Sequence, residues 1–306
     1  MLVLNMCYAN RLLTIELFMH NNNHPSNLDQ YLISEQLLAE AYDQTGDYKR
    51  SLMKKHIALL LDFYGHTPGY QEQQTVNTNT GYTHLKSYTP SKSLSVLLDL
   101  EFNAWNRLLA AVIPAAASGV ADIAAFFTGP CKTVPDSATL NALELAGVEL
   151  IYRIPHRQNL LSDPDLHHRS GLIIDFCDKP YSSDLLFSYI SKLKSIWLGS
   201  LEPMKGLIWA DSKLSWNYEL IAACHPEIAF TVAGEFIGSF PDFDYTKPDQ
   251  HLLEQEWDIF FGPRELFSKV NASRGFTPGL EFSWIWPELD QSFFKSKKFF
   301  CKETRI

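Results

Sequence analysis

The run Cys224-His225-Pro226-Glu227 gathers three side-chain types that take part in enzyme chemistry. A histidine beside a cysteine can accept the thiol proton and leave a nucleophilic thiolate. A second thiol, Cys177, follows the apolar run GLIIDF. For each cysteine the alternative, and the commoner case, is an inert thiol packed in the core. Nucleophilic catalysis by a thiol is therefore one hypothesis among several.

Motifs of the common catalytic and nucleotide-binding classes are absent. No GxGxxG, GxxxxGK[ST], GxSxG or HExxH is present in the sequence, which removes the usual fingerprints of nucleotide sites, α/β-hydrolases and zinc peptidases. His20 and His24 have the i, i+4 spacing of metal ligands on a helix. Three asparagines separate them, and because asparagine favours turns we interpret this run as a loop.

The elements that would position such residues are clearest between His84 and Ile154. HLKSYTP is typical of a strand, and the run from Ser91 to Gly119 is typical of a long apolar helix. VADIAAFFTG, PDSATLNALELAG and VELIYRIP predict a strand, a helix and a strand. Alternation at this spacing indicates a parallel βαβαβ unit, which commonly holds a ligand at the carboxyl ends of its strands.

The remaining chain extends this pattern in both directions. Residues 1–65 predict helices, and residues 66–83 predict a polar loop or linker. Strands and helices alternate again from Gly171 to about residue 234, after which an aromatic- and proline-rich region ends in the basic tail KSKKFFCKETRI. We therefore expect an α/β fold: a parallel twisted sheet flanked by helices, with an N-terminal helical extension. The expected divisions are 1–80, 81–170 and 171–306.

Composition limits the partners. The chain has 306 residues, 46% hydrophobic and 20% charged, with a formal net charge of −9, typical of a globular protein. Without a long basic run we expect neither nucleic acid nor an anionic membrane as a partner. The five cysteines form no CxxC pair, and no signal peptide or bilayer-spanning run is evident, so we expect reduced thiols in the cytosol.

Three segments of the predicted βαβαβ unit resemble the cofactor half of histidinol dehydrogenases, members of the aldehyde dehydrogenase-like fold. These are Tyr88-Thr89-Pro90, the run PAAASGV from Pro114, and the run ELAGVELIY from Glu144. In that family a YVPGG-like turn precedes a helix ending in PA-x-x-AG-V. The resemblance implies an NAD cofactor at Tyr88, Pro90 and Ser91. Ser91 and Lys92 stand where the family has two glycines, which allow close approach of backbone to a phosphate.

Two further similarities to that family imply catalytic and metal-binding residues. Pro226-Glu227 matches the first half of a PEHL motif whose Glu and His transfer protons, and because Ile228 replaces the His, His225 is the available imidazole. Asp244 and His251 have the separation found in GDYxxGxNHxLP, where the Asp is a zinc ligand and the His lies in the substrate site. The resemblance thus implies Glu227 with His225 or His251 as proton-transfer groups, and Asp244 with His251 as zinc ligands.

Two functions remain open. The first is a divergent NAD(P)-dependent oxidoreductase acting on a small alcohol or aldehyde. The second is a non-catalytic relative that uses the α/β scaffold for protein interaction or self-association, such as a homodimer. The missing glycines and the missing histidine favour the second, and the order of the matched segments favours the first. Convergence of Glu227, His225, Asp244 and His251 on one cleft beside Pro90 would favour the enzyme, and scatter would favour the scaffold.

Overall fold

The structure is a computed structural model, which describes residues 28–65, 69–77, 79–129, 133–155, 171–177, 195–199, 204–211, 213–234 and 243–303. The chain divides into two compact units, Met1–Leu32 and Ile33–Ile306. In the described part of the first unit, the short 3-10 helix η1 covers Asp29–Tyr31. Among the described residues, all the sheets and the longer helices belong to the second unit.

Two helices open the second unit, as the sequence predicted. The helix α2 (Glu35–Thr45) begins after Ser34, whose hydroxyl accepts a hydrogen bond from the Leu37 amide, a common N-cap arrangement. The helix α3 (Asp47–Tyr64) ends at Gly65, which has a φ of +68° that favours glycine. Of the predicted helical region, residues 1–27 lie outside the described residues, as do His20 and His24.

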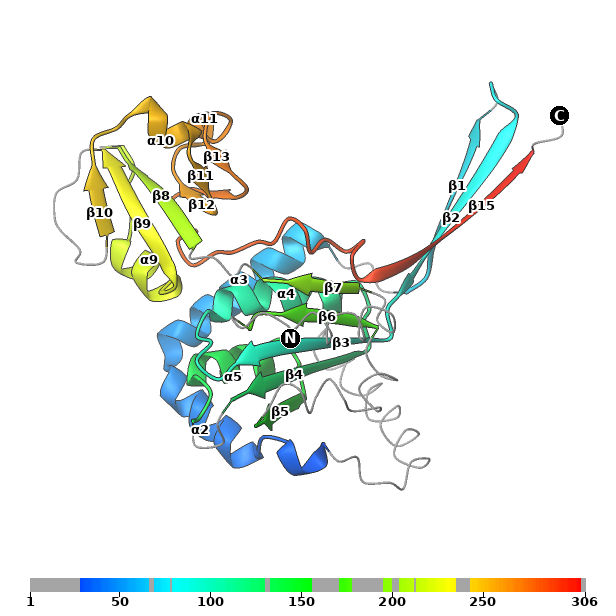
Figure 1. The fold of residues 1–306 in the computed structure, drawn as a ribbon, viewed down its shortest axis with the longest axis horizontal. Coiled ribbons are helices and arrows are strands. Elements are labelled where there is room, and N and C mark those ends of the chain that lie inside the picture. The colour runs from blue at the N-terminus through cyan, green and yellow to red at the C-terminus, as the bar shows by residue number, and fades with distance from the viewer. Residues whose placement is uncertain are drawn as a thin grey trace. The chain divides into compact units, whose positions relative to one another are not determined.

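The first parallel sheet has the strand order β5-β4-β3-β6-β7. Its strands are β3 (Ser93–Asp99), β4 (Asp122–Thr128), β5 (Leu150–Ile154), β6 (Leu172–Asp175) and β7 (Ser195–Leu198). The helices α4 (Trp105–Ala117) and α5 (Ser137–Leu145) cover one face of this sheet, and α2 and α3 form a further layer on them (Figure 1). The chain reverses direction across the sheet between β3 and β6, the usual ligand position in open α/β sheets.

The predicted boundary between the first strand and the first helix was wrong. The run from Ser93 to Asp99, expected to be helical, is β3, and the helix begins only at Trp105. HLKSYTP is a strand, but it belongs to a different, antiparallel sheet. β3 is buried over six successive residues. Such a continuous apolar run suits a buried parallel strand as well as a buried helix, so periodicity does not separate the two.

A second parallel sheet has the order β10-β9-β8-β12-β14. Its strands are β8 (Met204–Ala210), β9 (Ile228–Gly234), β10 (Phe243–Thr246), β12 (Ile259–Phe261) and β14 (Gly275–Phe276). The short helices here are α9 (Tyr218–Cys224), α10 (Gln250–Glu254) and α11 (Arg264–Phe267), and β11 (Glu256–Trp257) pairs with β13 (Asn271–Ala272). The expectation that the α/β pattern stops near residue 234 was therefore wrong, because parallel strands continue in shorter form.

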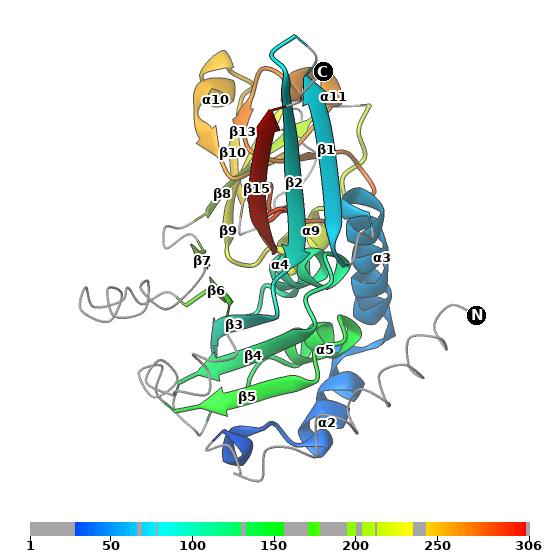
Figure 2. The same ribbon diagram turned by 90° about the vertical axis from the view of Figure 1, so that its right-hand side faces the viewer.

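An antiparallel sheet joins residues that are far apart in sequence. β2 (Tyr82–Pro90) pairs with β1 (Gln71–Asn77) on one side and with β15 (Lys295–Glu303) on the other (Figure 2). The predicted linker at 66–83 thus contains the whole of β1 and the start of β2, and the basic tail forms β15. All seven residues of β1 are exposed, as are the last seven of β15. This sheet therefore adds little to the hydrophobic core.

The core draws on both parallel sheets and on the aromatic C-terminal region. Among the largest side chains buried there are Trp105, Phe230, Phe261, Phe282 and Trp284. The described aromatic residues after Glu235 are thus largely packing residues. No helix among the described residues is long and apolar enough to cross a membrane.

Candidate functional site

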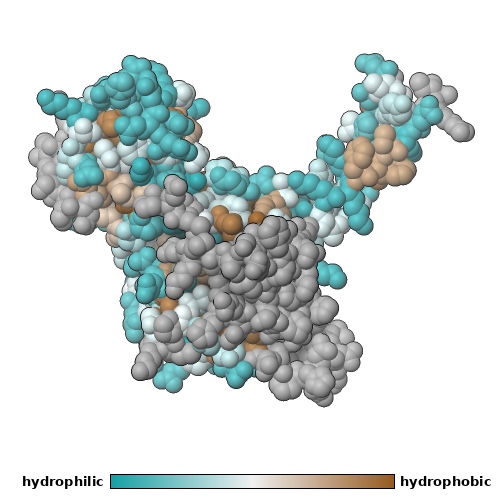
Figure 3. Space-filling model, in the orientation of Figure 1, coloured by the Kyte–Doolittle hydropathy of each residue, from teal (hydrophilic) through white to brown (hydrophobic). Residues whose placement is uncertain are grey.

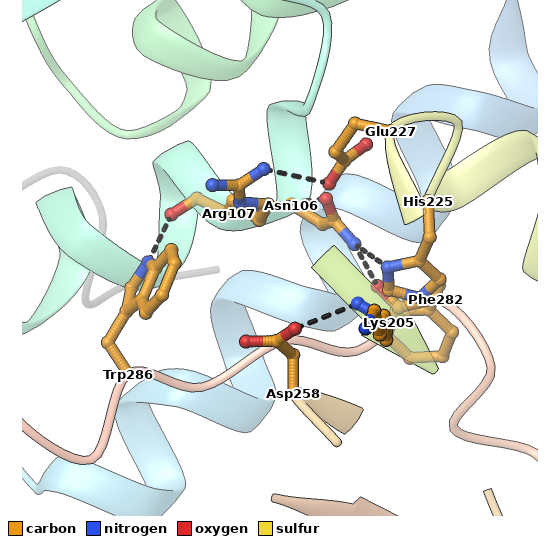
Figure 4. A network of polar contacts seen from close by, with 8 residues as sticks. All are labelled: Asn106, Arg107, Lys205, His225, Glu227, Asp258, Phe282 and Trp286. Atoms are coloured by element: carbon orange, nitrogen blue, oxygen red, sulfur yellow. Dashed lines mark hydrogen bonds and ion pairs between the residues drawn. The ribbon is translucent and has the colours of Figure 1, made fainter. Parts of the chain in front are cut away.

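The first turn of α4, one loop after the carboxyl end of β3, carries two polar residues in a buried setting. Asn106 and Arg107 are both buried within an otherwise apolar helix. Across from them, α9 ends at Cys224, and His225 and Glu227 occupy the short connection to β9. The predicted pair His225 and Glu227 is therefore brought next to the first turn of α4 (Figure 4).

His225 is hydrogen-bonded at both ring nitrogens. The Asn106 side-chain amide lies 3.0 Å from Nδ1, and the Glu281 carbonyl oxygen lies 2.8 Å from Nε2. Because the amide nitrogen can only donate and the carbonyl can only accept, the ring is the neutral Nε2–H tautomer. Burial lowers the pKa of His225 to about 3 despite the Glu281 hydrogen bond, and the Arg107 charge acts in the same direction. The imidazole therefore stays neutral at physiological pH.

Asn106 also contacts a second buried histidine. Its backbone oxygen lies 3.1 Å from Nε2 of His56, on α3, and its side-chain amide is 3.4 Å from the Phe282 carbonyl oxygen. Burial lowers the pKa of His56 to about 4. Asn106 thus links α3, α4 and the connection after α9 through neutral hydrogen bonds, which is the pattern of a structural network.

Glu227 forms an ion pair with Arg107, with 3.2 Å between Oε1 and Nη1. The other oxygen, Oε2, is buried and has no hydrogen-bond partner among the described residues. A carboxylate with one free oxygen can accept a proton from a substrate placed beside it. Of the residues predicted to transfer protons, Glu227 therefore keeps the clearest chemical capacity.

A second buried arginine shares the aromatic surroundings of Arg107. The Arg107 guanidinium carbon lies 5.6 and 5.3 Å from the ring centroids of Trp284 and Trp286, and that of Arg274 lies 4.3 and 4.8 Å from the same rings. Trp286 also donates a 3.0 Å hydrogen bond from Nε1 to the Arg107 carbonyl oxygen. Burial lowers the pKa of Arg274 to about 10. These contacts hold both cations on aromatic faces.

The other predicted proton-transfer residue lies elsewhere. His251 is on α10 with a side chain that is 84% exposed, and its Nδ1 is 3.6 Å from Oε2 of Glu254. Asp244, the predicted zinc partner of His251, is an exposed residue of β10 at the edge of the second sheet. Within the described residues, no group of three or more His, Cys, Asp or Glu side chains could hold a metal. The residues present do not fit a zinc site, and its assignment stays a prediction.

The predicted cofactor residues lie near the amino end of β3. Tyr88 and Pro90 are on β2, where Pro90 pairs with Lys295, and Ser91 donates its amide hydrogen to the Phe294 carbonyl oxygen across 2.8 Å. The carboxyl edge of the first sheet is at the opposite end of β3. The structure thus does not bring these three residues together with His225 and Glu227. Their role in cofactor binding stays a prediction.

A nicotinamide dinucleotide fits the carboxyl edge only in part. Asp99 and Asp175 end the central strands β3 and β6, and carboxylates there can accept hydrogen bonds from ribose hydroxyls. A pyrophosphate would need amides at a helix start. In α4 the Arg107 amide donates to Oδ1 of Asn106, and the Leu108 amide donates to the Ala104 carbonyl. This helix end does not fit the pyrophosphate.

Neither candidate thiol is poised as a nucleophile. Cys224 is buried, and burial raises its pKa to about 12, so the thiolate is scarce at neutral pH. Cys177, also buried, follows β6, where its amide donates to Oδ1 of Asp175 and its sulfur lies 3.7 Å from the Thr128 hydroxyl. The inert alternative describes Cys224 best.

Sequence reasoning missed the residues that hold His225 in place. Asn106 is 119 residues from His225 in the sequence. The contact between them forms only in the folded chain, so no local sequence pattern predicts it. One signal was available, because the adjacent pair Asn106-Arg107 opens an otherwise apolar helix. Buried polar residues of this kind require partners.

Comparisons with known proteins find solved structures with a similar fold. No protein-family model and no curated protein matches the sequence. A histidinol dehydrogenase from Elizabethkingia anophelis aligns with a TM-score of 0.61 and 12% identity, over 97% of this chain and 84% of that one. The chain has a histidinol dehydrogenase-like fold. An NAD-dependent benzaldehyde dehydrogenase from Corynebacterium glutamicum aligns with a TM-score of 0.53 and 10% identity, over 88% of this chain and 82% of that one. The predicted fold class and its resemblance are thereby confirmed.

Proposed function

We propose that this chain is a non-catalytic relative of the dehydrogenases whose fold it shares, and that it uses the α/β scaffold for self-association. The proposal that the chain is non-catalytic rests on one observation. His225 is fully buried, and Asn106 and Glu281 are hydrogen-bonded to its two ring nitrogens. A proton shuttle needs a ring nitrogen that faces the substrate and a pKa near the working pH. His225 has neither.

The scatter of the remaining candidates supports the same proposal. Glu227 is paired with Arg107, His251 and Asp244 are exposed on the second sheet and its helix, and Pro90 lies in the antiparallel sheet. A catalytic centre needs its groups within reach of one reacting atom. This set does not form one cleft.

A turnover assay tests the proposal. The purified protein is incubated with NAD+ or NADP+ and a panel of small alcohols, and with the reduced cofactors and small aldehydes, while absorbance of the reduced nicotinamide is followed. We expect no turnover above the rate of a Glu227→Gln control. Turnover by the natural protein that Glu227→Gln abolishes would overturn the proposal.

The antiparallel sheet supports self-association. β15 is an outer strand of that sheet and exposes Phe299 and Phe300 by 62% and 58%; an apolar patch is visible on this sheet in Figure 3. An unpaired strand edge with apolar side chains is a template for pairing with another strand. We infer that the occupant is β15 of a second copy.

Charge placement supports this occupant. If two copies of β15 pair antiparallel with Phe299 opposite Phe299, the exposed lysines Lys297, Lys298 and Lys302 each face an uncharged residue. Like charges directly opposite one another are destabilising, and this register avoids them. Aromatic pairing across the strands adds to the interaction.

Sedimentation velocity over a range of concentrations tests the dimer. We expect a concentration-dependent dimer in the natural protein and a monomer in Phe299→Lys, because a lysine there meets its own copy. Lys205→Gln, an exposed change on β8, is the matched control and should leave the dimer intact. A natural protein that remains monomeric at all concentrations would contradict the proposal.

A second candidate is an NAD(P)-dependent oxidoreductase acting on a small alcohol or aldehyde. Two observations favour it: the strand order with its reversal between β3 and β6, and the buried free oxygen of Glu227. A thermal-shift titration separates the candidates, since a ligand of the native state raises the unfolding temperature. A shift with NAD+ together with turnover supports the oxidoreductase. Both candidates fit a cytosolic protein, as expected from the cysteines.

A further inference from the structure

A pocket with a volume of about 540 Å³ lies at the base of the antiparallel sheet and is lined by none of the residues around His225. It is lined by the end of α3, by β1 and β2, by the loop before β15, and by the first residue of β15. Its lining residues include Phe63, Tyr64, Tyr88, Pro287, Asp290 and Lys295. The volume is within the range of small-molecule sites, and aromatic walls with a few polar groups are typical of them.

Lys295 is the basic residue of this pocket. The whole residue is only 5% exposed, and its ammonium donates a 3.2 Å hydrogen bond to Oε1 of Gln71. The other lysines of β15 that follow it, Lys297, Lys298 and Lys302, are exposed. A buried ammonium gains most from an anionic group that replaces its lost hydration. Lys295 is therefore placed to anchor an anion.

The rest of the lining limits the anion to a single charge. Asp290 is part of the same wall, and its Oδ1 accepts hydrogen bonds from the amides of Ser292 and Phe293, at 2.8 and 3.1 Å. A carboxylate in the lining of the pocket opposes a second negative charge on the ligand. Phosphates are thus disfavoured, and a monocarboxylate is compatible.

The aromatic walls indicate what the carboxylate is attached to. Phe63 and Tyr64 pack edge to face with ring centroids 4.9 Å apart, and Tyr88 lines the pocket from β2. The Tyr64 hydroxyl donates to the Trp286 carbonyl, and Gln291 donates to the Gly65 carbonyl. These bonds fix the walls in place, and a pre-formed apolar wall favours a rigid planar body.

We propose that this pocket binds a small monocarboxylate with a planar apolar body, with the carboxylate on Lys295 and that body against Tyr64 and Tyr88. Burial lowers the pKa of Lys295 and so disfavours its charged form. A bound carboxylate favours the charged ammonium and offsets this effect, which also supports the site. The site is independent of the residues around His225, so it can be present in either candidate function.

Ligand-observed NMR with phenylacetate as the probe tests the site on the full chain. We expect phenylacetate to bind, and its neutral amide, phenylacetamide, and the dianion phenyl phosphate to bind about tenfold more weakly or not at all. Lys295→Gln should weaken phenylacetate binding about tenfold, whereas Lys298→Gln, an exposed change on the same strand, should leave it unchanged. Ser292→Trp, which places a bulky side chain in the pocket wall and leaves Lys295 itself unchanged, should also block the probe.

Each opposite result overturns the proposal. These are no phenylacetate binding at about 10 mM, equal binding of phenylacetamide, or equal losses in Lys295→Gln and Lys298→Gln. Circular dichroism and the unfolding temperature show whether each variant is folded. If Lys295→Gln does not fold, the comparison of phenylacetate with phenylacetamide and the Ser292→Trp variant decide the question. Failure of this site leaves the sedimentation and turnover results unaffected.

Discussion

The side-chain amide of Asn106 donates a hydrogen bond to Nδ1 of His225 across 3.0 Å, while its backbone oxygen contacts His56 at 3.1 Å. Asn106, in the first turn of α4, thus fixes the tautomer of one buried histidine and contacts one ring nitrogen of another. Both histidines are fully buried. A proton-transfer site needs an imidazole that can reach the substrate. In this network the His225 imidazole instead makes structural hydrogen bonds.

Removing the Asn106 amide should destabilise the protein. Asn106→Ala leaves the buried Nδ1 of His225 without its donor, and we expect a loss of about 1–3 kcal/mol in the free energy of unfolding. Urea denaturation measures the loss. Asn103→Ala, at an exposed position in the preceding loop, is the control and should change little. Equal effects of the two substitutions would contradict the structural role of Asn106.

Stability should fall as the pH is lowered below 6.5. The pKa values of His56 and His225 are lowered from 6.5 to about 4 and about 3 by burial, so the unfolded chain binds protons first. The free energy of unfolding keeps its full value above pH 6.5. It decreases as the pH falls from 6.5 toward the folded-state pKa values of about 4 and about 3. Each histidine contributes a slope of up to about 1.4 kcal/mol per pH unit.

Urea denaturation from about pH 7.5 to about pH 5 measures this slope before most carboxylates titrate. His225→Gln should remove the contribution of that residue. His251→Gln is the matched control because its side chain lies on the surface. A slope unchanged by His225→Gln would show that the ring is not buried in its neutral form.

The Arg107–Glu227 ion pair should show coupling in a double-mutant cycle. Glu227→Gln leaves a buried guanidinium without its anion, and Arg107→Met leaves a carboxylate without its cation. Because the two groups are 3.2 Å apart and mostly buried, we expect a coupling of about 1–2 kcal/mol between the two substitutions. Additive losses of stability would mean that the pair contributes only through separate packing.

The thiols should differ in reactivity. Cys301 is exposed on β15, whereas Cys224 is buried and burial raises its pKa to about 12. Iodoacetamide at neutral pH should modify Cys301 in the native protein and reach Cys224 only after unfolding. Peptide mass spectrometry distinguishes the two sites, and Cys301→Ser removes the native labelling of the β15 peptide. Rapid native labelling of Cys224 would revive a thiol mechanism.

The fold class could be predicted because the strongest local patterns agree with it. VADIAAFFTG, PDSATLNALELAG and VELIYRIP contain β4, α5 and β5. The start of α4 was missed because the mostly apolar run from Leu94 to Leu98 suits a buried helix as well as a buried strand. β1 and β15 were missed because an exposed antiparallel sheet lacks the alternation of buried and exposed residues that marks a strand.

The site could be predicted only where its residues are adjacent in sequence. His225 and Glu227 lie two positions apart, so a local motif found both. Their partners Asn106, Arg107 and Glu281 come from distant parts of the chain, and only the fold brings them close to the connection after α9. The predicted pairing of Asp244 with His251 relied on separation alone, and both residues lie on exposed surface.

The protonation of His225 tests the central claim most directly. Long-range ¹H–¹⁵N NMR of the histidine rings, followed through a pH titration, reports the tautomer and charge of each ring. We predict that His225 carries its proton on Nε2 and stays neutral from about pH 8 to about pH 5. A His225 ring that becomes charged near pH 6.5, the ordinary value, or that carries its proton on Nδ1, would contradict the account.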